Sequence, residues 1–185
     1  MRAGTLFHDL KALLHTEDPA HLGPESRRNA LAIPELDRRL DGALRDIRPT
    51  PALKELMRAL VYLWHDHLDA SHRIAQEIEN ADGSLVHGIM HRREPDYSNA
   101  KYWFRRVGSH PSFLALAVRG GEVLEKRGET DLHSRLVPNK MWDPFAFVDA
   151  VEDAAEGQFR SKVPILEEIQ KIEFECLLEN IVNRI

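Results

Sequence analysis

The chain has 185 residues, of which 43% are hydrophobic and 30% charged, a composition typical of a soluble globular domain. Its formal net charge of −5 offers no basic surface for nucleic acid, and no apolar run approaches the roughly 18 residues that span a bilayer. The single cysteine, Cys176, excludes an internal disulfide and a cysteine-based zinc site, and the N-terminus lacks the cleavage site of a secretory signal. We therefore expect a cytoplasmic protein that binds neither nucleic acid nor membrane.

Apolar residues recur at helical spacing along most of the chain, and no stretch alternates polar and apolar residues in the way of a strand. The chain is therefore predicted to be all-α. Threonine 50 and aspartate 143 each precede a proline, a pair that caps and starts a helix, whereas Pro95 ends one. The predicted helices cover about residues 4–15, 34–46, 51–64, 66–79, 84–94, 98–107, 111–127, 144–155 and 164–183.

Two segments are predicted as connectors. Residues 16–33 contain prolines and glycine with weak periodicity and indicate a loop or short irregular helix, and residues 128–142 form the second connector. The chain is then expected to divide into an N-terminal helical arm and loop, 1–49, and a helical body, 50–185. Short helices with short turns favour antiparallel helical hairpins, close in spacing to a tetratricopeptide unit although no residues repeat; an irregular bundle is the alternative.

The last predicted helix, 164–183, has an apolar arc wider than half its circumference. Such an arc indicates burial on two sides, either as a central packing helix or as the seam of a homodimer. Glu173 lies within this arc, and Arg93 lies within the apolar arc of helix 84–94. Because an unpaired buried charge is costly, we predict that each is paired, with Arg92 or Arg93 bound to Glu173. The alternative is that Arg93 reaches solvent at the helix end.

Residues 64–106 hold five of the ten histidines and two of the three tryptophans. On each of three neighbouring helices, polar side chains follow one edge of the apolar face at spacings of three and four residues. If the helices pack through those faces, the edges converge on one rim. The candidate ligand-binding residues on it are Asp69, His72, Gln76, His87, His91, Arg92, Glu94, Asn99, Tyr102 and Arg106.

Three functional hypotheses fit this rim. The first is a small anionic molecule or peptide, held by arginines and by the free N–H groups at the start of helix 98–107. The second is a metal ion on four of these residues, or an enzyme in which histidine beside a carboxylate acts as a base. The third is a purely structural or protein-interaction role. The metal ligands in the second hypothesis would be His72, His87, His91 and Glu94, although Arg92 and Arg93 would repel a cation.

The strings WHDHLDASH, HGIMHRREPDYSNAKYWFRRVG, WDPFAFVDAVE and EIQKIEFECLL resemble segments of a group of bacterial hypothetical proteins. The resemblance covers about residues 60–180 and implies a helical protein. It implies no activity, cofactor or substrate. Phe104 stands where that group has tyrosine, a mild departure from its pattern.

Overall fold

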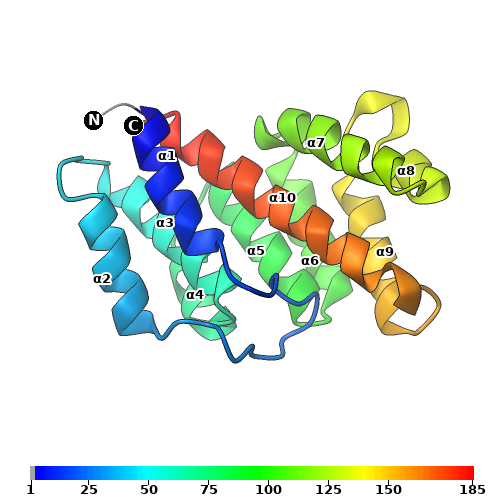
Figure 1. The fold of residues 1–185 in the computed structure, drawn as a ribbon, viewed down its shortest axis with the longest axis horizontal. Coiled ribbons are helices and arrows are strands. Elements are labelled where there is room, and N and C mark those ends of the chain that lie inside the picture. The colour runs from blue at the N-terminus through cyan, green and yellow to red at the C-terminus, as the bar shows by residue number, and fades with distance from the viewer. Residues whose placement is uncertain (1–2) are drawn as a thin grey trace.

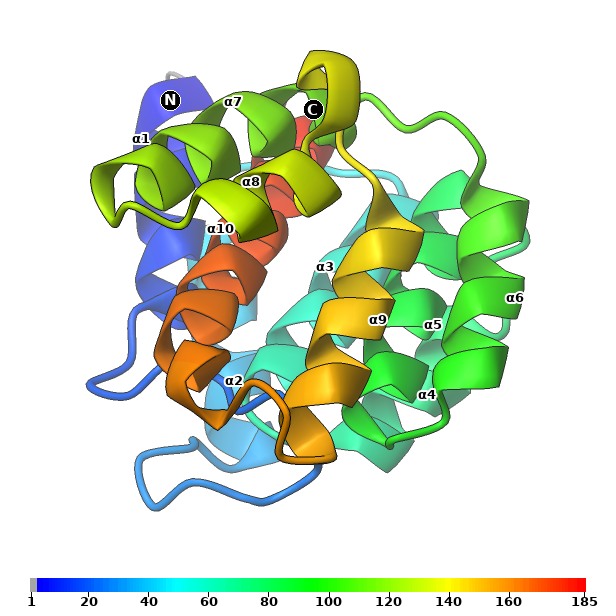
Figure 2. The same cartoon turned by 90° about the vertical axis from the view of Figure 1, so that its right-hand side faces the viewer.

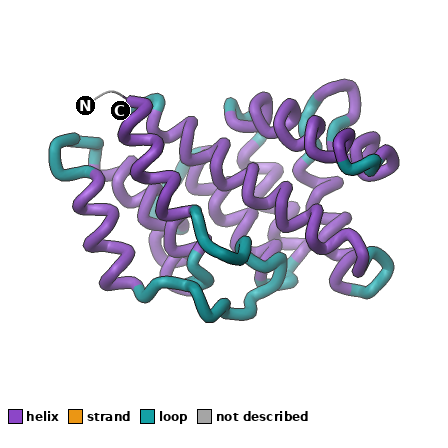
Figure 3. Tube along the Cα trace, viewed as in Figure 1, coloured by secondary structure: helices purple, strands orange, loops and turns teal. Residues whose placement is uncertain are grey.

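The computed structural model describes residues 3–185, and over that range it is all-α, with ten α-helices and no strand (Figures 1 and 3). Three short 3-10 turns lie at Ala12–Leu14, Pro138–Lys140 and Arg160–Lys162. None of the described helices combines the length and the apolar character needed to cross a membrane. The α-helices are α1 (Ala3–Lys11), α2 (Ile33–Ala43), α3 (Pro51–Trp64), α4 (Leu68–Ala75), α5 (Ala81–Arg93), α6 (Tyr97–Val107), α7 (Ser112–Lys126), α8 (Thr130–Leu136), α9 (Pro144–Ala155) and α10 (Val163–Val182).

The helix starts follow the local chemistry of the sequence. The Thr50 hydroxyl accepts a hydrogen bond from the Leu53 backbone N–H at 3.3 Å, and the Asp143 carboxylate caps α9. The bounds of α3 and α9 are those predicted. The segment predicted as a connector, 128–142, contains α8, so that part of the prediction was wrong. Its seven residues bury only Leu132 and Leu136, too short a pattern to reveal a helix.

Helix α10 lies at the centre of the molecule and packs against α1, α3, α7 and α9. Figure 1 shows it running across the molecule from the end near α1 toward α9, and Figure 2 shows α7 and α8 beside it. Its two sides contribute to two core clusters, one with Phe174 and Leu178 and the other with Leu166 and Ile169. Packing within one chain therefore accounts for the wide apolar arc. A homodimer through this helix stays a prediction, as does the tetratricopeptide-like pairing of helices.

Two arginines at the end of α5 are fully buried and paired. Arg92 makes two hydrogen bonds to the Glu173 carboxylate, at 3.1 and 2.5 Å, and its guanidinium lies 4.2 Å from the Phe147 ring centroid. The predicted pairing of Glu173 is thus confirmed, with Arg92 as its partner. Arg93 is 0% exposed and binds Asp66 at 2.8 Å, so the alternative in which it reaches solvent was wrong.

The N-terminal segment is bound to the body through buried polar groups. Arg27 binds the same Asp66 carboxylate at 2.9 Å and donates to the Trp64 carbonyl. Arg93 donates to the Gly23 carbonyl, and the Gln170 amide donates to the Ala20 and His21 carbonyls. Loop 15–32 is therefore fixed against α3, α5 and α10 by buried side chains that hydrogen-bond to its backbone and to Asp66. The division of the chain at residue 49 stays a prediction, although Leu6 and Leu10 share one core cluster with α3 and α10.

Candidate metal centre

Three histidines from two helices meet at one point of the structure. His72 lies on the last turn of α4, and His87 and His91 lie one turn apart on α5. One ring nitrogen from each can be chosen so that all three lie within 4.8 Å of one another. The edges of α4 and α5 therefore converge, as the spacing of polar residues requires if their apolar faces pack together.

The rings are held in a defined arrangement. His87 and His91 are stacked, with centroids 5.2 Å apart and planes 8° apart. The His72 ring stands nearly perpendicular to both, at 4.6 and 5.5 Å. On α6, Trp103 stacks on His87 with a centroid distance of 3.9 Å. Gly88 makes this approach possible, because a Cβ there would lie 3.1 Å from the Phe104 ring of α6.

Polar side chains surround His91. The Glu94 carboxylate lies 3.2 Å from its Nδ1 atom, and the Asp96 carboxylate lies 4.0 Å from the same atom. The Asn99 amide nitrogen lies 3.1 Å from Nε2. Since amide oxygen and nitrogen exchange by a half-turn, Asn99 can present either a donor or an acceptor here. These three residues fix the orientation of the His91 ring.

The environment favours the neutral form of His87 and His91. His87 is 2% exposed, and burial, with smaller contributions from His72 and His91, lowers its pKa to about 4. Burial also lowers the pKa of His91, against the opposing effect of Glu94. The Nδ1 atom of His87 is buried and has no hydrogen-bond partner among the described residues. A buried imidazole nitrogen without a partner is uncommon and calls for an explanation.

The arginines expected near the cluster do not join the histidines. Arg92 follows His91 by one residue, about 100° around the helix, and faces α10. The Arg93 guanidinium faces Asp66. Arg106 and Tyr102 are exposed and contact Trp103, with the Arg106 guanidinium 5.4 Å from its ring centroid. The repulsion that counted against a metal ion is thus reduced, because each of the two buried guanidinium groups is paired with a carboxylate.

The remaining candidates do not join the histidines. Asp69 is exposed and lines a shallow groove together with Arg73 and Glu94, and Gln76 is exposed near the end of α4. Of the ten candidates, the structure brings together His72, His87, His91, Glu94 and Asn99.

A transition metal fits the three-histidine group on two grounds. Imidazole is a ligand that Zn²⁺, Cu²⁺ and Ni²⁺ accept, and His87 carries a buried nitrogen with no hydrogen-bond partner among the described residues. Zn–N bonds of about 2.0–2.1 Å place tetrahedral ligand atoms roughly 3.3 Å apart. The observed nitrogens, within 4.8 Å, need only a small side-chain adjustment, which the half-buried His72 can make.

Some polar groups of this region carry weak sequence patterns and were not predicted. Asp66, which joins Arg27 and Arg93, lies in the break between α3 and α4, where no periodicity identifies its partners. A second cluster joins the buried Asp82 carboxylate to buried His110 at 3.1 Å and to the exposed Arg184 at 2.8 and 3.0 Å. It fastens the start of α5 and the residues after α10 to the segment just before α7, and only the fold brings these residues together.

Comparison of the chain with known protein families, with curated proteins and with solved structures finds no match.

Proposed function

We propose that this protein binds one divalent transition-metal ion through His72, His87 and His91. The observation that carries the proposal is the convergence of three ring nitrogens within 4.8 Å. One of these histidines, His87, also has a buried nitrogen that finds no partner in the part of the chain that the structure describes. Among metals found in proteins, Zn²⁺ is the best match to three imidazole ligands, because it accepts four ligands without a strong geometric preference.

Glu94 is the positioning residue of this site. Its carboxylate, 3.2 Å from the Nδ1 atom of His91, accepts a hydrogen bond when that nitrogen is protonated. That bond leaves Nε2 free of a proton and available to the metal, the arrangement common for metal-bound histidine. Asn99, 3.1 Å from Nε2, would then either move aside or turn its amide oxygen toward the metal.

Three protein ligands leave one position of a tetrahedral ion open, as in catalytic rather than structural zinc sites. A bound Zn²⁺ supplies a Lewis acid there and lowers the pKa of a bound water to about 7. The open position is also where the anionic ligand suggested by the sequence would bind. Support for that second proposal comes from Arg106 and Tyr102, which remain exposed beside Trp103, next to His87.

The test is native mass spectrometry of untagged, freshly purified protein, followed by titration of the metal-free protein with Zn²⁺ and Co²⁺. One ion per chain is expected. At a metal concentration about 100-fold above Kd, binding stabilises the fold by about 2.7 kcal/mol, or roughly 5–10 °C in Tm for a chain of this size. The visible spectrum of bound Co²⁺ reports whether the ion is four-coordinate.

His72→Gln removes one ligand from the half-buried edge of the site and is expected to weaken binding at least 100-fold. His15→Gln is the matched control, because His15 is exposed and far along the chain from the triad. Equal metal affinity of the wild type and His72→Gln would contradict the proposal. Wild-type protein that takes up no ion would contradict it as well, and a co-purified anion without metal would leave only the second proposal.

A further inference from the structure

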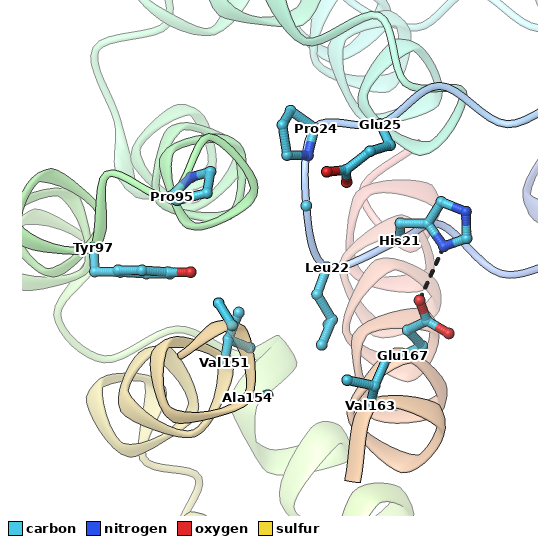
Figure 4. Close-up of a pocket in the computed structure, with 12 residues that line it drawn as sticks. His21, Leu22, Pro24, Glu25, Pro95, Tyr97, Val151, Ala154, Val163 and Glu167 are labelled. Carbon is cyan, nitrogen blue, oxygen red and sulfur yellow. Dashed lines mark hydrogen bonds and ion pairs between the residues drawn. The ribbon is translucent and has the colours of Figure 1, made fainter. Parts of the chain in front are cut away.

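A separate cavity of about 500 Å³ lies between loop 21–25, the start of α6, the second half of α9 and the start of α10 (Figure 4). Sites for small molecules fall in this size range, and they form where several elements meet. None of the residues that line this cavity belongs to the three-histidine group.

The walls of the cavity are mainly apolar. Leu22 from the loop, Val151 and Ala154 from α9 and Val163 from α10 face it, and the Tyr97 ring of α6 extends into it with its hydroxyl pointing across the space (Figure 4). Burial, together with the charges of Glu152 and Glu156, raises the pKa of Tyr97, so this hydroxyl stays protonated. The cavity thus has an apolar lining that includes one aromatic ring.

The charges around the cavity are negative. Glu25 and Glu167 line it, and among the described residues no lysine or arginine does. Figure 4 shows the Glu25 carboxylate turned inward, and Glu167 bound to His21 at 3.0 Å. An anion placed here would meet two carboxylates and no lysine or arginine, whereas an ammonium group would gain both carboxylates and the Tyr97 ring.

The wall formed by the loop is held in place before any ligand arrives. Buried Gln170 donates to the Ala20 and His21 carbonyls, and buried Arg93 donates to the Gly23 carbonyl at 3.2 Å. Leu22, between these anchors, is 8% exposed. A preformed cavity spares the ligand the entropy of ordering a loop, which favours affinity.

We propose that this cavity is a binding site for a small organic cation, a primary amine on an apolar body of about the size of a phenylethyl group. The apolar part lies against Leu22, Val151 and Tyr97, and the ammonium group lies between Glu25 and Glu167.

The experiment is isothermal titration calorimetry of the full chain, freed of metal, with three probes of one shape and different charge. These are 2-phenylethylamine, the neutral 2-phenylethanol and the anion phenylacetate. Saturable binding of one amine per chain is expected, with the alcohol bound at least about tenfold more weakly and no binding of phenylacetate. Absence of saturable amine binding, or equal binding of amine and alcohol, would overturn the proposal.

Two variants and a matched control locate the site. Glu167→Gln is expected to weaken amine binding about fivefold, because it removes one of the two carboxylates that attract the ammonium group. Glu168→Gln removes the same charge from the neighbouring position of α10, where Glu168 pairs with Arg127 at 3.0 Å outside the cavity, and is expected to bind the amine as the wild type does. Equal weakening by both variants would show a diffuse charge effect and overturn the site.

Ala155→Leu adds a larger apolar side chain at the cavity wall. The fold should tolerate it, because Ala155 is exposed at the end of α9. It is expected to reduce binding of the amine and of the alcohol alike, because it fills the apolar space rather than changing charge. Unchanged amine binding in a folded Ala155→Leu protein would place the ligand elsewhere and overturn the proposal.

Discussion

Replacing His87 with phenylalanine in the metal-free protein tests whether burial lowers the pKa of this histidine. The variant keeps a planar ring to stack on Trp103 and removes the nitrogen that has no partner. In the folded protein the pKa of His87 is lowered from 6.5 to about 4 by burial first and by its histidine neighbours second. As the pH falls below 6.5, the unfolded chain therefore binds the proton before the folded chain does, and His87 lowers the free energy of unfolding.

The size of this effect follows from the two pKa values. One pKa unit corresponds to about 1.4 kcal/mol, so the complete effect, reached below pH 4, is about 3 kcal/mol. At pH 5 it is about 2 kcal/mol. At pH 7 both states are neutral at this position, and the phenylalanine variant is expected to be at least as stable as the wild type, since a buried unpaired nitrogen is lost.

The assay is urea unfolding of metal-free wild type and His87→Phe at pH 7 and pH 5, followed by circular dichroism. The stability difference between the two proteins should shift by about 2 kcal/mol in favour of the variant between these pH values. The His15→Gln control should follow the wild type at both. A difference that does not change with pH would refute the reasoning, because it would show that His87 titrates normally in the folded state.

Three further predictions concern the buried pairs and the packing of α5. Breaking the Arg92–Glu173 pair with Glu173→Gln should cost about 3–5 kcal/mol in urea unfolding, whereas the double variant Arg92→Met with Glu173→Leu should lose much less; equal losses would contradict a paired buried charge. Asp66→Asn should destabilise the fold by at least about 3 kcal/mol at pH 7. Burial raises the pKa of Asp66, but hydrogen bonds from Arg27 and Arg93 outweigh it and the pKa is lowered. The stability difference from the wild type should therefore close as the pH falls through that lowered pKa. Gly88→Ala should lower the Tm and cost about 1–3 kcal/mol, since its Cβ would lie 3.1 Å from the Phe104 ring. Gly42→Ala, in the last turn of α2 with nothing within 4 Å of the added Cβ, should instead stabilise by about 0.5–1 kcal/mol. A Gly88→Ala protein as stable as the wild type would contradict the tight packing of α5 on α6.

The all-α fold and most helix bounds could be predicted because they depend on local chemistry. Thr50 and Asp143 cap their helices through the backbone N–H groups that follow them, so three or four residues decide the outcome. The pairing of Glu173 could be predicted for a similar reason, since any charge on an apolar face needs a partner. Helix α8 could not, because its seven residues are stabilised by packing rather than by their own pattern.

The residue types of the candidate site could be predicted, but only some of the predicted residues belong to it. His87 and His91 share one face of a helix by spacing alone, and His72 joins them through the packing of α4 on α5. The direction of Arg92 could not be read from spacing, because it depends on the position of Glu173, 81 residues further along the chain. The cavity beside Tyr97 was not predicted at all, since four separate segments build it.

The shared carboxylate of Asp66 restricts how this sequence can change over evolutionary time. Two guanidinium groups from distant parts of the chain, Arg27 and Arg93, depend on that one anion, and all three side chains are nearly or completely inaccessible. Loss of the Asp66 carboxylate alone strands both buried guanidinium groups, whereas loss of one arginine leaves the other paired. A change at Asp66 is therefore expected only together with changes at Arg27 and Arg93. In an alignment of relatives these three columns should therefore vary jointly, and a lineage that abandoned the arrangement should have replaced all three by uncharged residues.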